Sequence, residues 1–157
     1  MFGNPHLMQP THFTMDPLAV GLPMVREVAE IYFTQNTFGF ALERGDLAST
    51  MTDDPFGLGF PPRDYIRSLH LTTSFRPLDQ YRGVTEEEVL TLFYEQLKSL
   101  TLITRKDRLC VNVLLDTHFS DNDTKHERMM LNILEVLRQP IYDLMHAGTK
   151  LDLTHHN

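Results

Sequence analysis

The sequence contains a single cysteine and no tryptophan, and its acidic residues outnumber its basic ones. One cysteine, Cys110, cannot form a disulfide within the chain. Its neighbours in "RLCVNVLLD" are mostly apolar, so we expect the thiol to be buried as a small hydrophobic group. The formal net charge of -7 opposes binding to a phosphate backbone, because such binding depends on Lys and Arg side chains. Nucleic acid is therefore not an expected partner.

Long apolar runs are also missing from the sequence. No window approaches the roughly 18 consecutive apolar residues that a membrane-spanning helix needs. The amino terminus lacks the basic start and apolar stretch that mark a secretory signal. We therefore predict no membrane contact and expect a cytoplasmic or nuclear protein.

The length of 157 residues and the hydrophobic content of 41% fit one globular domain with its own core. Residues 1–22 contain three prolines and no hydrophobic period, so they are predicted to form an irregular arm. A single α/β domain is expected over 23–154. Residues 155–157 are expected to form a short tail.

Hydrophobic periodicity predicts that helices alternate with strands along this domain. Helices are expected from Pro23 to near Thr34, from Thr85 to just before Leu100, and over 121–139, where Pro140 is expected to kink or restart the last one. Strands are expected over 37–42, 65–73, 100–104 and 109–119, and at Leu151 and Leu153. The run 109–119 is almost continuously apolar, which is typical of a strand covered on both faces. Thr85 and Glu88 have the spacing of a capping box.

This order of elements favours an α/β fold with a mixed, mainly parallel sheet of about four or five strands. The segments "IRSLHL" (66–71) and "LKSLTL" (97–102) share a spacing of apolar residues that is similar to the strand portion of a leucine-rich repeat. We therefore expect β/α units of the leucine-rich-repeat kind.

One polar cluster follows the strand 109–119 and forms a candidate metal site. Asp116, His118 and Asp121 offer the oxygen and imidazole ligands that Mg, Mn or Zn accept. A working site would need a further ligand from another loop, such as Asp53, Asp54 or Asp79. The alternative is a solvated loop in which Asp121 or Asp123 caps the following helix, since loop aspartates are common.

Three apolar residues in the loop "DDPFGLGFPPRD" are the candidates for partner binding. Phe56, Leu58 and Phe60 would form an exposed apolar patch if the loop presents them to solvent. The nearby Gly57 and Gly59 do not form a phosphate loop, because no Lys-Ser/Thr pair follows them. His70 is expected to be partly exposed, on the same side of its strand as Ser68 and Thr72.

The segment "VREVAEIYFTQNTFGF" resembles a helix-to-strand segment of fungal F-box-like proteins, in which "R-x-E-A-x-x-x-F/Y-Y" leads into "x-N-T-F-x-F". The match is carried by Arg26, Glu27, Ala29, Tyr32, Phe33, Asn36, Thr37, Phe38 and Phe40. The later stretches "YIRSLHLT" and "IYDLMHAGTKLDLT" resemble the family's next strand and its usual ending, so the resemblance extends over most of 24–154.

The resemblance implies a protein-interaction module with a protein partner, no catalytic residues and no cofactor. In the family, an amino-terminal box with a Leu-Pro-x-Glu-like start contacts the ubiquitin-ligase adaptor. This sequence has only "VGLPMV" before the helix, so adaptor binding is not expected. The competing hypothesis is a small metal-dependent enzyme that uses Asp116, His118 and Asp121.

Overall fold

The computed structural model describes residues 20–54, 57, 59–75, 83–117 and 124–156, which form one α/β domain around a single sheet. The four strands are β1 (Thr37–Ala41), β2 (Ser68–Phe75), β3 (Cys110–Thr117) and β4 (Lys150–His156). They pair in the order in which they occur along the chain, and every pair is parallel. The predicted α/β class is confirmed, whereas the predicted mixed sheet is replaced by an all-parallel one.

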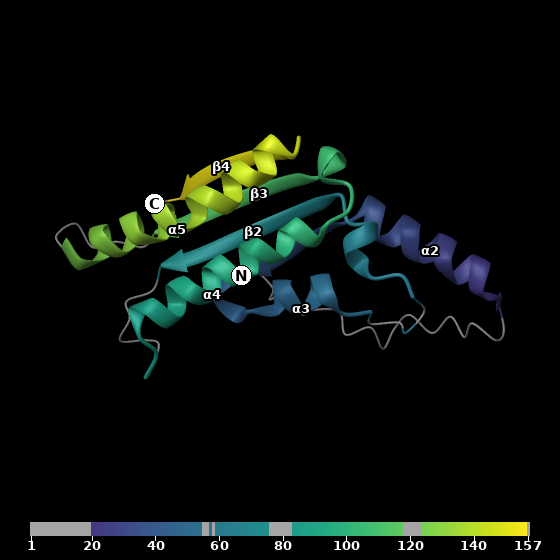
Figure 1. Cartoon of the computed structure of the whole chain (residues 1–157), viewed down its shortest axis with the longest axis horizontal. Helices are drawn as coiled ribbons and strands as arrows, with labels where there is room; N and C mark the ends of the chain where they lie inside the picture. The colour runs from purple at the N-terminus through teal and green to yellow at the C-terminus, as the bar shows by residue number, and fades with distance from the viewer. Residues whose placement is uncertain (1–19, 55–56, 58, 76–82, 118–123, 157) are drawn as a thin grey trace, which may run out of the picture.

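All the helices that connect these strands lie on the same face of the sheet (Figure 1). α3 (Asp46–Thr52) connects β1 to β2, α4 (Glu86–Lys98) connects β2 to β3, and α5 (Thr124–His146) connects β3 to β4. When strand order follows chain order, crossovers of one hand place every connecting helix on one side. The sheet therefore has a helix-covered face and an opposite face, which we call the open face.

The core lies between the sheet and these helices. In the central row of the covered face, Phe40, Leu71 and Val113 occupy paired positions on three neighbouring strands, and each is at most 7% exposed. From the helices, Phe93 of α4 and Ile133 of α5 are each 1% exposed and join the same cluster. Alternation along the strands puts the intervening residues on the open face.

The first helix, α2 (Leu22–Gln35), joins β1 through a corner of packed aromatic rings. Val25, Ala29 and Phe33 form its buried stripe, as their helical spacing predicts. The ring of Phe38 in β1 lies 5.6 Å from Tyr32 and 5.5 Å from Phe33. These contacts hold the end of α2 against the start of β1 and confirm the predicted helix-to-strand corner.

The start of α4 is fixed by the predicted capping box. The Glu88 backbone N–H donates to Thr85 Oγ1 at 3.3 Å, and the Thr85 backbone N–H donates to Glu88 Oε2 at 2.7 Å. The Thr85 hydroxyl lies 2.9 Å from the same carboxylate oxygen. These bonds satisfy two backbone donors that a helix start otherwise leaves without partners, and they lower the pKa of Glu88.

Replacing Thr85 with alanine is expected to lower the free energy of unfolding by about 1 kcal/mol, because an N-cap side chain is lost. The lowered pKa of Glu88 gives a stabilisation that is present above the carboxyl's unfolded pKa and is lost as the pH falls through its folded pKa. Urea unfolding at several pH values measures both effects. The exposed Glu87 provides the control: Glu87→Gln should keep this acid-dependent loss of stability, whereas Glu88→Gln should reduce it.

The last crossover helix, α5, is continuous from Thr124 to His146 and contains Pro140 within it. Of the two expectations for Pro140, a kink or a restart, the restart is wrong, because one helix runs through this position. β4 continues to His156, so two residues predicted as a tail extend the edge strand instead.

Two further expectations do not hold. Residues 100–104 do not form a strand, because Ser99–Leu102 (η5) is a turn of 3₁₀ helix that continues directly from α4. The two leucine-spaced segments consequently differ: 66–71 enters β2, whereas 97–102 ends α4 and forms η5. In the described part of the chain they are not copies of one repeat unit, since the same apolar spacing serves a strand in one and a helix end in the other.

Candidate functional site

The open face of the sheet is the candidate functional surface. No residue whose side chain it presents is fully buried among those described. In order along the strands, these residues are Thr37, Gly39 and Ala41 of β1, Ser68, His70 and Thr72 of β2, Cys110, Asn112, Leu114 and Asp116 of β3, and Lys150, Asp152 and Thr154 of β4. Most of them are polar. The predicted placement of His70 beside Ser68 and Thr72 is confirmed.

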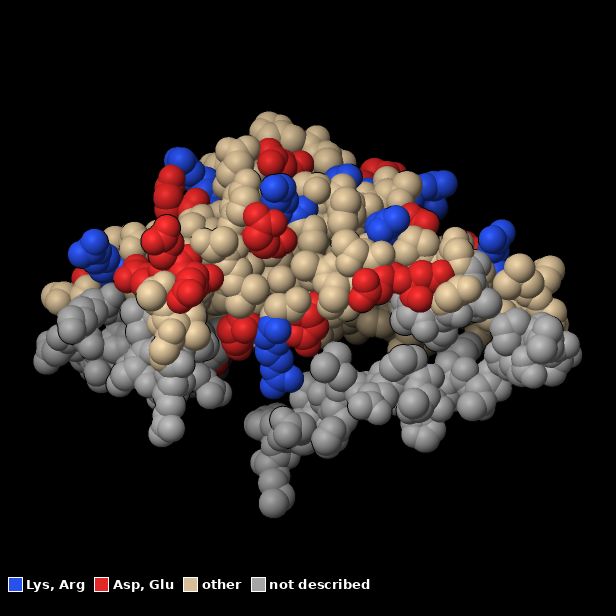
Figure 2. Space-filling view, turned by 60° about the horizontal axis from the view of Figure 1, so that its bottom comes forward, with Lys and Arg blue, Asp and Glu red and all other residues tan. Residues whose placement is uncertain are grey.

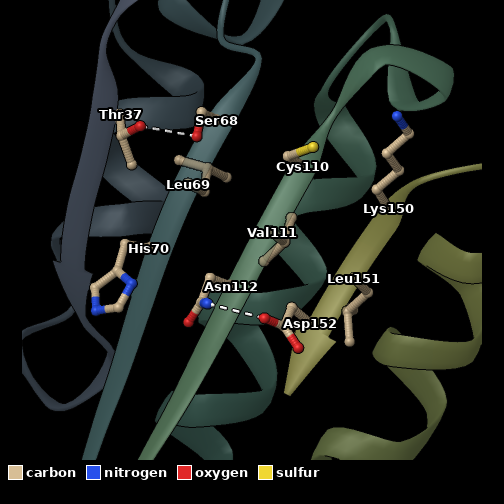
Figure 3. Close-up of a pocket in the computed structure, with 10 residues that line it drawn as sticks. All are labelled: Thr37, Ser68, Leu69, His70, Cys110, Val111, Asn112, Lys150, Leu151 and Asp152. Carbon is tan, nitrogen blue, oxygen red and sulfur yellow. Dashed lines mark hydrogen bonds between the residues drawn. The ribbon is translucent and has the colours of Figure 1, made fainter. Parts of the chain in front are cut away.

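A shallow hollow of about 220 Å³ lies on this face near the amino-terminal ends of the strands (Figure 3). Its lining residues are Thr37, Ser68, Leu69, His70, Cys110, Val111, Asn112, Lys150, Leu151 and Asp152. They come from all four strands. Gly39 occupies the β1 position next to His70. Because glycine has no side chain, nothing projects from β1 at this position beside the hollow.

Asn112 and Asp152 form the polar floor of the hollow. They are paired across β3 and β4, and the Asn112 amide nitrogen donates to Asp152 Oδ2 at 3.4 Å. The amide oxygen of Asn112 points the other way, toward β2 (Figure 3). This oxygen is buried and accepts no hydrogen bond in the described structure. A buried acceptor without a partner is costly, because it has lost its hydrogen bonds to water.

Cys110 also lies in the hollow, and its thiol is exposed, so the predicted burial is wrong. Alternate residues of this strand enter the core, which makes the surrounding sequence apolar. Cys110 is not one of them, and its side chain lies on the open face. Figure 3 shows its sulfur directed toward the β4 side, away from the imidazole of His70 on β2. The two side chains therefore do not form the hydrogen-bonded pair that would activate a cysteine nucleophile.

The predicted metal ligands are only partly within the described structure. Asp116 lies near the carboxyl end of β3 on the open face, whereas His118, Asp121 and Asp79 lie outside the described residues. Asp54 Oδ2 accepts a hydrogen bond from the Gly59 backbone N–H at 2.6 Å, which ties it to its own loop. The described residues contain no group of three side chains placed to hold a metal ion.

The predicted apolar patch has one member within the described structure. Phe60 is 2% exposed and belongs to the core, and the Arg26 guanidinium of α2 lies 5.2 Å from the centre of its ring. Phe60 is therefore unavailable to a partner, because it anchors its loop beneath α2. Phe56 and Leu58 lie outside the described residues.

Comparison of the chain with models of protein families, with curated proteins and with solved structures finds no match. None of the helices described is long and apolar enough to cross a membrane. The geometry of the open face therefore carries the functional argument that follows.

Proposed function

We propose that this protein is an interaction module that binds a protein partner through the open face of its sheet. One observation carries the proposal: four adjacent strands present polar, accessible side chains on a face that no described helix covers. A parallel sheet is ordinarily buried on both faces. A face that the described helices leave uncovered therefore calls for an explanation, and a bound partner provides one.

The polar character of the open face suits a partner that dissociates. Interfaces between proteins that also exist separately are about as polar as the rest of the surface, with hydrogen bonds distributed through them. The exposed carboxylate of Asp152 is an acceptor for such bonds. The resemblance of "VREVAEIYFTQNTFGF" to fungal F-box-like proteins supports the same class of function. The proposal does not include binding to the ubiquitin-ligase adaptor.

The proposal is tested with two matched substitutions. Thr72 lies at the centre of the open face, and Thr91 is exposed on α4, so Thr→Arg at each position adds the same side chain to opposite sides of the molecule. Wild-type protein and both variants are immobilised, incubated with a fungal lysate and compared by quantitative mass spectrometry. We expect the Thr91→Arg variant to capture the same proteins as the wild type in the same amounts. The Thr72→Arg variant should bind them about tenfold more weakly, which corresponds to about 1.4 kcal/mol of binding free energy.

Far-UV circular dichroism and thermal unfolding provide the folding control for both variants. If the wild type and the two variants capture the same proteins in the same amounts, the open face is not the contact surface and the proposed function is wrong.

A further inference from the structure

The amino-terminal edge of the sheet gathers basic side chains in a chain that is acidic as a whole. Parallel strands begin at the same edge, so the segments 62–68, 103–110 and 148–150 meet there. Together these segments contain six basic residues, Arg63, Arg67, Arg105, Lys106, Arg108 and Lys150, and two acidic residues, Asp64 and Asp107. The whole chain, by contrast, has 14 basic and 21 acidic residues. We call this edge the basic rim.

Backbone contacts hold the three segments of the basic rim together. The Cys110 N–H donates to the Arg67 carbonyl at 2.8 Å, and the Lys150 N–H donates to the Leu109 carbonyl at 2.9 Å. The Thr149 hydroxyl donates to the Lys106 carbonyl at 3.0 Å. The main chain from which the basic side chains extend is therefore held in a fixed arrangement.

The basic side chains of the rim donate their described hydrogen bonds to carbonyl groups and not to carboxylates. Arg63, Arg67 and Lys106 donate to main-chain carbonyl oxygens, namely those of Met51, of Ile66 and Asp64, and of Ile103. Carbonyl acceptors satisfy the donors but leave the charge in place. None of the six forms an ion pair with a residue that the structure describes.

The charges also lie close enough to repel one another. Burial first, and then the charges of Arg105 and Arg108, lower the pKa of Arg67, while Asp107 and Glu30 oppose this effect. Concentrated like charges destabilise a surface unless an opposite charge relieves them. The rim therefore favours a bound anion.

Three of the cations are free to reach such an anion. Arg105, Arg108 and Lys150 are exposed, and no described group accepts a hydrogen bond from their side chains. Lys150 also lines the hollow, and Figure 3 shows its ammonium group at the edge of the sheet beside the turn that precedes β3. That turn contains Lys106–Arg108 (η6). The rim and the hollow thus form one continuous surface.

We propose that the basic rim binds an acidic segment of the protein partner, whose carboxylates contact Arg105, Arg108 and Lys150 while its backbone crosses the adjoining hollow. This inference rests on the proposed function and names the chemistry of the partner. An acidic peptide fits better than a nucleic acid. On the face shown in Figure 2, Asp and Glu cover more of the surface than Lys and Arg, and the whole chain has 21 acidic and 14 basic residues, so a long phosphate backbone would meet net repulsion beyond the rim.

The test is an NMR titration of the full-length, ¹⁵N-labelled protein with a capped hexaglutamate peptide. We expect amide shifts concentrated in 62–68, 103–110 and 148–150, and an affinity that falls as ionic strength rises from about 0.01 M to about 0.15 M. The double variant Arg105→Glu/Arg108→Glu should bind at least about tenfold more weakly, because reversed charges repel the peptide.

The matched control is Arg44→Glu/Arg128→Glu, which makes the same change in net charge at two exposed arginines outside the rim. It should bind hexaglutamate as the wild type does. Equal losses in both double variants would show that only net charge matters and would overturn the inference. The inference would also be overturned if the rim amides did not shift, or if hexalysine bound as tightly as hexaglutamate. Equal affinity for inorganic phosphate alone, or tighter binding of a single-stranded oligonucleotide of equal charge, would overturn it as well. A failure here, with Thr72→Arg still reducing partner capture, would leave the proposed function intact.

Discussion

Replacing Phe60 with alanine is expected to lower the free energy of unfolding by about 3–5 kcal/mol. The ring is 2% exposed, and the Arg26 guanidinium lies over it, so truncation removes both core packing and the contact that holds α2 to this loop. Stabilities of small domains are about 5–15 kcal/mol in total, so this loss is a large share. Urea unfolding followed by circular dichroism measures it.

The control for Phe60→Ala is Tyr142→Ala, which truncates an aromatic side chain that is 52% exposed on α5. We expect a change of about 0.5 kcal/mol or less, because an exposed ring loses little packing and alanine favours the helix. If both variants lose the same stability, or if Phe60→Ala loses none, the burial of Phe60 beneath α2 is wrong and the loop presents this ring to solvent.

Replacing Leu71 with alanine is expected to cost about 2–5 kcal/mol. Leu71 lies in β2 on the covered face, where it is fully buried between Phe40 and Val113. A leucine on the neighbouring strand gives a direct comparison. Leu114 of β3 is half-buried and faces the opposite way, so Leu114→Ala should cost about 1 kcal/mol or less.

The pair Leu71→Ala and Leu114→Ala distinguishes a sheet covered on one face from a sheet covered on both. Chemical denaturation of the two variants under identical conditions gives the difference directly. Equal, large losses would mean that the open face is packed against another part of the protein, and the proposed interaction surface would then be an interior one. A large loss for Leu71→Ala alone supports an accessible open face.

Local patterns predicted the elements that depend on nearby residues. The capping box of Thr85 and Glu88 was predictable because both groups lie within one helical turn. The corner at Tyr32, Phe33 and Phe38 followed from a helical period that changes to a strand period within a few residues. The prediction of a strand at 100–104 was wrong because a short apolar run fits a helix end as well as a strand. In the structure, α4 continues into η5 at this point.

The candidate site was less predictable than the elements. The apolar run around Cys110 indicated a strand covered on both faces, yet the helices that the structure describes cover only one. Which face of a strand is exposed depends on where the connecting helices lie, and strand order determines this. The cations of the basic rim are likewise separated in sequence, since Arg67, Arg108 and Lys150 precede or begin three different strands.

The sequence by itself determined the α/β class, the alternation of helices and strands, and the caps and corners that join them, because these follow from periodicity and from contacts within a few residues. Only the tertiary structure decided that the sheet is wholly parallel with its strands in chain order. That order places every connecting helix on one face. It thereby leaves Asn112 and Cys110 on the open face and brings the cations of the basic rim together. The burial of Phe60 beneath α2 likewise depends on a contact between segments far apart along the chain.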